Sequence, residues 1–135
     1  MKNLTDRKRN TLVAFAVLGD ALVFVLFIVL APVEHGMVQI EALGRTALPF
    51  AGVWFVASPW LGAFRISTLT CWRLAVWRIP FIWLGCGVVA VMLRVWFTDR
   101  TFSWAFTLAS ITLVAAMLLA WRALLFVVAR RISRV

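Results

Sequence analysis

The sequence predicts an all-α integral membrane protein, a single domain over residues 1–135 that folds as a bundle of four transmembrane helices. Apolar residues make up 64% of the chain and charged residues 14%, against about 45–50% and about 25% in soluble domains. The mean hydropathy is +1.00. A domain of this length has too little interior to bury so many apolar side chains. A soluble domain, a disordered chain and a disulfide-stapled secreted domain are therefore excluded.

Four apolar runs are long enough to cross a hydrocarbon core of about 30 Å at about 1.5 Å per residue. They cover residues 10–33, 46–64, 76–97 and 102–128. The first run follows a basic leader but is longer than the apolar region of a signal peptide, about 7–15 residues. It also contains Asp20. We therefore expect a retained helix that ends near Pro32.

The second span follows a polar loop, Glu34–Arg45. Pro49 lies in its first turn, where a missing N–H costs little, and Pro59 is expected to kink or end the helix. A second loop, Arg65–Trp77, precedes the third span.

The third span has a short charge-free centre, residues 79–93, bracketed by Arg78 and Arg94. Long arginine side chains reach the interfaces from such positions. The fourth span is free of charge from Phe102 through Trp121.

The basic residues predict the orientation. The leader, the second loop with Arg78 and the tail with Arg122 carry eleven Lys and Arg, and the other side carries Arg45, Arg94 and Arg100. The positive-inside rule then places both termini in the cytoplasm, with the protein in the plasma membrane. Because these charges cluster at the ends of apolar runs, the lipid bilayer is the expected partner and nucleic acid is not.

Asp20 is the most informative residue, because a carboxylate within a membrane span is costly. It must face the bundle interior, find a partner or be protonated. Positions of equal depth fall near Trp54, residues 85–87, Ser110 and Thr112, and we expect Ser110 or Thr112 to hydrogen-bond to it. Arg94 is the expected charge partner, although it lies about 10 Å further outward. Two interpretations stay open: a proton or ion relay or substrate anchor, and a polar residue that fixes helix packing.

Small residues form a stripe along one face of the fourth span: Ala105, Ala109, Thr112, Ala116 and Ala120. Small side chains allow helix backbones to approach closely in lipid, so we expect this face to pack within the bundle.

Two further groups have both a functional and an ordinary interpretation. His35 with Glu34 is a candidate loop site for a metal or cofactor, but one His and one acid do not specify a metal site. Arg78 and Arg122 are expected near the cytoplasmic interface, as lipid-headgroup contacts or as interfacial anchors.

Catalytic motifs do not occur in the sequence: it has no phosphate-binding glycine loop, nucleophile elbow or Cys/His pair. With a single His, most hydrolytic sites cannot be assembled from this chain. We therefore expect no enzymatic activity, no catalytic residues, no metal and no cofactor.

Six motifs follow one another along the chain: Gly19-Asp20-Ala21, His35-Gly36, Leu48-Pro49-Phe50-Ala51-Gly52-Val53-Trp54, Leu61-Gly62-Ala63-Phe64, Leu93-Arg94 and Trp121-Arg122. In their order and spacing the chain resembles, over nearly its whole length, the bacterial and archaeal membrane family known as domain of unknown function 3054. The resemblance implies four transmembrane helices and no assigned activity.

Two functions remain in view. The first is a non-enzymatic accessory, assembly or structural component of the membrane, as a homo-oligomer or within a larger complex. The alternative is a small oligomeric transporter or proton-coupled permease in which Asp20 titrates.

Overall fold

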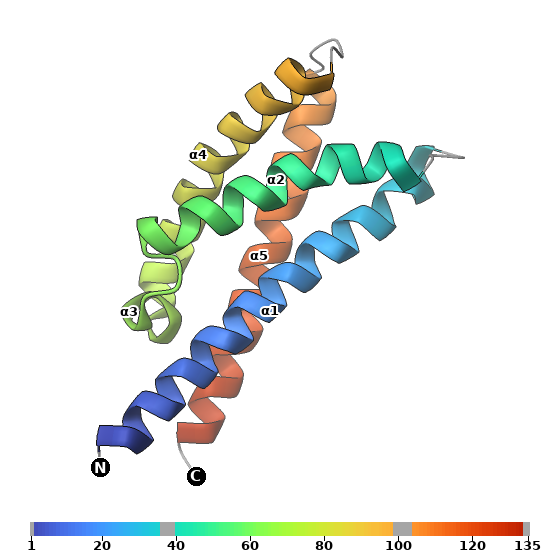
Figure 1. Ribbon diagram of the computed structural model, residues 1–135. Coiled ribbons are helices and arrows are strands. Elements are labelled where there is room, and N and C mark those ends of the chain that lie inside the picture. Colours follow the sequence, from blue (N-terminus) through green and yellow to red (C-terminus); the bar gives the residue numbers. More distant parts are fainter. Residues whose placement is uncertain (1, 36–39, 99–103, 134–135) are drawn as a thin grey trace.

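The computed structural model describes the backbone of residues 2–35, 40–98 and 104–133. Side chains are described for residues 6–30, 47–97, 104–105 and 107–131. In these residues the chain is helical throughout, with short turns (Figure 1). The helices are α1 (Lys2–His35), α2 (Ile40–Leu61), α3 (Ile66–Thr70), α4 (Trp72–Thr98) and α5 (Trp104–Ser133). The predicted all-α class is therefore confirmed.

Three helices are long and apolar enough to cross a membrane. Their apolar stretches cover Asp6–Leu30 in α1, Trp72–Phe97 in α4 and Thr107–Arg131 in α5, and a shorter one covers Ala47–Leu61 in α2. Large apolar side chains are widely exposed on the outside of the bundle, among them Leu18, Val56 and Met92. Soluble monomers rarely expose apolar surface on this scale, so the exterior is compatible with lipid.

The four long helices form a ring. α1 packs against α2 and α5, and α4 packs against the same two helices. The N- and C-termini lie at the same end of the molecule, where α1 begins and α5 ends (Figure 1). This arrangement brings the first and last helices of the chain side by side.

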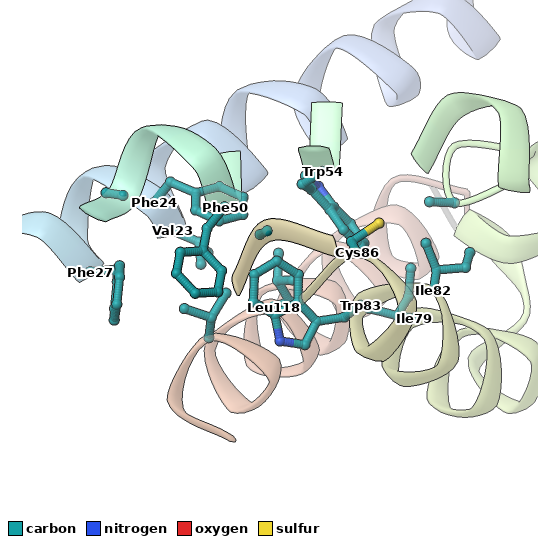
Figure 2. Close-up of a cluster of buried hydrophobic side chains, with 14 of the residues drawn as sticks. Val23, Phe24, Phe27, Phe50, Trp54, Ile79, Ile82, Trp83, Cys86 and Leu118 are labelled. Carbon is teal, nitrogen blue, oxygen red and sulfur yellow. The ribbon is translucent and has the colours of Figure 1, made fainter. Parts of the chain in front are cut away.

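Aromatic residues fill the centre of the ring around Trp83 of α4 (Figure 2). The ring centroids of Phe24 and Trp54 each lie 5.8 Å from that of Trp83, and the centroid of Phe50 lies 6.0 Å away. Tilted and edge-on pairs at this separation add stabilisation beyond the buried area. The Trp83 indole also donates a hydrogen bond of 2.9 Å to the carbonyl of Ile111, which ties α4 to α5.

The end of α2 is closed by a glycine turn. Gly62 has φ +86°, which lies in the left-handed region. The Ala63 N–H donates to Ser58 O at 2.9 Å and the Gly62 N–H donates to Pro59 O at 3.3 Å. This is the pair of bonds of a Schellman cap, which ends the helix two residues after Pro59. The predicted span reached residue 64, whereas α2 continues through Pro59 and ends at Leu61.

The second loop, predicted as Arg65–Trp77, contains helical structure instead. α3 occupies Ile66–Thr70, with Thr68 and Leu69 buried, and α4 already begins at Trp72. α3 packs against α1, α4 and α5. Arg65 and Arg73, two basic residues that suggested a loop, are exposed in this segment. Charge spacing alone does not distinguish a loop from a helix with exposed basic residues.

The first loop is also shorter than predicted. α1 continues past Pro32 to His35, and α2 begins at Ile40. Intrahelical hydrogen bonds remain favourable beyond the end of an apolar run, so hydropathy underestimates helix length.

The predicted packing face of α5 is wrong. Every member of the small-residue stripe is exposed: Ala105, Ala109, Thr112, Ala116 and Ala120. The buried face instead carries Thr107, Ser110, Val114, Leu118, Arg122 and Leu125. The two rows are offset by two residues, about 200° around a helix, so they lie on opposite faces.

Candidate functional site

A buried ion pair joins α1 to α5. The Arg122 Nη2 lies 2.7 Å from the Asp20 Oδ2, and both side chains are almost wholly buried, at 2% and 0% exposure. Asp20 lies near the middle of the apolar stretch of α1, and Arg122 lies well inside that of α5. Each charge therefore has its counter-charge within hydrogen-bonding distance, in surroundings where an isolated charge is strongly unfavourable.

The same carboxylate oxygen also holds α2. The Trp54 Nε1 donates a hydrogen bond of 3.1 Å to Asp20 Oδ2. Trp54 is fully buried and packs edge-on against Trp83. The indole thus connects the polar pair to the aromatic core, and the sequence-based depth that placed Trp54 level with Asp20 is confirmed.

Arg122 makes two further contacts, both with the turn after α2. Its Nη1 donates a long hydrogen bond of 3.4 Å to the carbonyl of Ala63. Its Cζ lies 5.1 Å from the centre of the Phe64 ring, within the range of a cation–π interaction. One guanidinium thus contacts α1 and the α2–α3 turn at once.

The helices that carry the pair are also in contact one residue away from it. A Cβ placed on Gly19 would collide with the indole ring of Trp121. Gly19 and Trp121 immediately precede Asp20 and Arg122. The absence of a side chain at Gly19 therefore lets α1 and α5 come close enough for the pair to form.

Polar contacts continue from the pair toward the end of the bundle that carries the termini. Gly62, the neighbour of Ala63, accepts a hydrogen bond of 3.0 Å from Thr68 Oγ1. Thr68 Oγ1 in turn accepts one of 3.2 Å from the Nη1 of Arg78, which is partly buried. Arg122 thus bonds directly to the Ala63 carbonyl, whereas Arg78 is linked to the adjacent Gly62 carbonyl only through the Thr68 hydroxyl.

Four buried polar atoms around the pair have no hydrogen-bonding partner among the described residues: Asp20 Oδ1, Arg122 Nε, Ser58 Oγ and Trp121 Nε1. Ser58 lies one helical turn after Trp54 and therefore faces the same side of α2. Unsatisfied buried polar atoms are uncommon in folded proteins, and several in one place call for an explanation.

The partners predicted for Asp20 are not those the structure shows. Arg122, not Arg94, pairs with it. Ser110 is buried on α5 and Thr112 is exposed, and neither hydrogen-bonds to Asp20. Arg94 is partly buried on α4. Arg122 lies about three helical turns after Ser110. The position on the fourth span that is level with Asp20 was therefore predicted about three turns too close to the start of that span.

Arg122 is the residue that the sequence interpretation misplaced, as an interfacial anchor. A signal was present: residues 123–129, which follow it, are all apolar. A charge flanked by apolar residues on both sides belongs inside a span rather than at its edge. Arg78, by contrast, is partly buried near the end of the bundle where α4 begins.

The structure does not test the candidate loop site formed by Glu34 and His35. Glu34 and His35 are the last residues of α1, and their side chains lie outside the described part of the chain. Among the residues that the structure does describe, no three His, Cys, Asp or Glu side chains come together as metal ligands would.

Chemically, the arrangement neutralises and immobilises a charge. Breaking one side of a buried pair typically costs about 3–5 kcal/mol, because the other charge stays behind unpaired. The free Oδ1 and Nε leave this pair able to accept one more hydrogen bond and donate another.

Of the comparisons with known proteins, only the one with family profiles found a match. No curated protein and no solved structure matches the chain. Residues 17–125 match the sequence profile of the family described as Protein of unknown function (DUF3054), and all the residues of the buried pair and its surroundings lie in that range. The resemblance noted in the sequence is thereby confirmed, and the chain belongs to this family.

Proposed function

We propose that this chain is a non-enzymatic component of the cell membrane, an accessory or assembly subunit that acts within a larger membrane complex. It crosses the bilayer four times, through α1, α2, α4 and α5, with both termini in the cytoplasm. Two observations support this topology. The termini lie at one end of the bundle (Figure 1), and the sequence gives that side most of its Lys and Arg.

The observation that carries the proposal is the Asp20–Arg122 pair. Asp20 is held by Arg122 at 2.7 Å and by Trp54 at 3.1 Å, and it is fully buried. A carboxylate that must change its protonation or bind a cation in each transport cycle requires a counter-charge that can move away from it. Here the partner is fixed between α1 and the α2–α3 turn, which favours a role in holding the helices together.

The alternative is a small oligomeric transporter in which Asp20 titrates. One observation favours it: Oδ1 of Asp20 and Nε of Arg122 have no hydrogen-bonding partner within the part of the chain that the structure describes. In that case the pair would open during transport, and Asp20 would exchange a proton or bind a substrate group.

The experiment is mass determination of the intact complex, gently extracted from native membrane, for the wild type and for Asp20→Asn. Asp6→Asn is the matched control, because Asp6 is exposed and pairs with Arg9 only at the surface, at 3.6 Å. A foreign subunit present in fixed stoichiometry supports the accessory role. We expect Asp20→Asn to weaken this association and Asp6→Asn to leave it unchanged.

The transporter is tested on the same preparations after reconstitution into vesicles. A homo-oligomer with nothing bound, together with a proton-dependent flux that Asp20→Asn abolishes and Asp6→Asn retains, would overturn the accessory role.

A further inference from the structure

The buried pair uses only half of the hydrogen-bonding capacity of its two side chains. Arg122 contacts Asp20 through Nη2 and Ala63 through Nη1, so that Nε is left over. Asp20 receives both of its hydrogen bonds on Oδ2, so that Oδ1 is left over. A fork-to-fork arginine–carboxylate pair would engage both carboxylate oxygens. Here only one carboxylate oxygen is engaged, and the fork is closed on one side only, with Arg122 Nε and Asp20 Oδ1 unpartnered among the described residues.

Two more open groups surround this fork. Ser58 is fully buried on α2, and its backbone carbonyl accepts from Ala63, whose own carbonyl accepts from Arg122. Trp121 adjoins Arg122 in the chain and lies against Gly19, the neighbour of Asp20. The Ser58 hydroxyl and the Trp121 indole N–H are both unpartnered among the described residues. The four open groups therefore belong to residues of α1, α2 and α5 that form the pair or adjoin its contacts.

We propose that the Asp20–Arg122 pair is a binding site for a buried water molecule, which accepts a hydrogen bond from Arg122 Nε and donates one to Asp20 Oδ1. The Ser58 hydroxyl and the Trp121 N–H supply its remaining partners. A buried water requires about two to four polar partners, and these four atoms provide that number.

The chemistry of the site selects this ligand. The carboxylate and the guanidinium cancel, so the site favours neither an anion nor a cation. It presents two N–H donors, one carboxylate acceptor and one hydroxyl that serves as either. A small neutral molecule that both donates and accepts fits this set, and water is the smallest. Ordered water likewise satisfies free polar groups inside membrane proteins.

The test uses the full chain in lipid bilayers and measures magnetisation transfer from water to side-chain N–H groups by solid-state NMR. The Trp121 indole N–H and the Arg122 Nε–H are the reporters. The Trp83 indole is the matched control, because its N–H is committed to the Ile111 carbonyl at 2.9 Å. We expect transfer to Trp121 and Arg122 to build up several times faster than transfer to Trp83.

A second variant separates a specific water from general hydration of the bundle. Ser58→Ala removes one partner and is expected to slow the transfer to Trp121 and Arg122. Ser110→Ala removes another buried serine, about 18 Å along α5 from Arg122 at about 1.5 Å per residue, and is expected to leave the transfer unchanged. Transfer to Trp121 and Arg122 as slow as that to Trp83 would overturn the proposal and indicate a closed fork. Equal effects of the two serine variants would also contradict it.

Discussion

Arg122 and Asp20 are 102 residues apart in the chain, yet their Nη2 and Oδ2 atoms lie 2.7 Å apart in the interior of the bundle. The contact joins the first helix to the last. It places both charges of opposite sign inside apolar stretches, so that together they add no net charge to the interior. The helices α1, α2 and α5 meet at this point, through Asp20, Trp54 and Arg122.

Gly19→Ala is predicted to destabilise the bundle strongly. The added Cβ collides with the Trp121 indole, so α1 and α5 must separate and the neighbouring ion pair must stretch. Overpacking of this kind typically costs about 1–3 kcal/mol. The measurement is the free energy of unfolding in detergent micelles.

Gly52→Ala and Gly85→Ala are the matched controls for this prediction. Both glycines lie within helices, and a Cβ at either position meets nothing within 4 Å. Alanine is the better helix former by about 0.5–1 kcal/mol, so these variants are expected to be neutral or slightly stabilised. A Gly19→Ala protein as stable as these two would mean that α1 and α5 are not so close.

Gly62→Ala is predicted to loosen the α2–α3 turn. The left-handed φ of +86° at this residue costs a residue with a Cβ about 1–2 kcal/mol. The Gly62 carbonyl also holds Thr68, so strain at this turn is expected to reach α3. Hydrogen exchange of residues 63–70 is expected to accelerate, while exchange in the middle of α4 stays unchanged. Unchanged exchange throughout would show that the turn tolerates a side chain.

Some of this architecture can be read from the sequence and some cannot. Apolar run length predicts α1, α4 and α5, and the burial of Asp20 follows from the cost of a charge inside a span. The partner of Asp20 does not follow, because it depends on the relative height of α1 and α5. That height is set by side-chain packing, such as Gly19 against Trp121. Hydropathy carries no information about it.

The buried face of α5 illustrates the same limit. Two rows of residues along this helix are periodic, the small one through Thr112 and the larger one through Val114. Small side chains face acyl chains without penalty, whereas Arg122 in the larger row does not. The pairing of Arg122 with Asp20 places that row inward, and residue size, on which the prediction rested, carries no information about this pairing.

Native cysteines offer a test of the proposed orientation. Cys71 is exposed in the turn between α3 and α4, whereas Cys86 is buried within α4. If both termini are cytoplasmic, a membrane-impermeant maleimide is expected to label Cys71 in inverted vesicles and not in intact cells. Cys71→Ser is expected to abolish the labelling, since Cys86 is shielded. Labelling of Cys71 in intact cells would place this end of the bundle outside.

The most direct measurement is a double-mutant cycle on the free energy of unfolding, with Asp20→Asn, Arg122→Gln and the double variant. A parallel cycle on Asp6 and Arg9, an exposed pair at 3.6 Å, serves as the control; such surface pairs couple by about 0–1 kcal/mol. If the buried pair fastens α1 to α5, each single variant loses up to about 3–5 kcal/mol and the double variant loses much less than the sum. Additive losses at Asp20 and Arg122, no larger than those of the surface pair, would contradict the account.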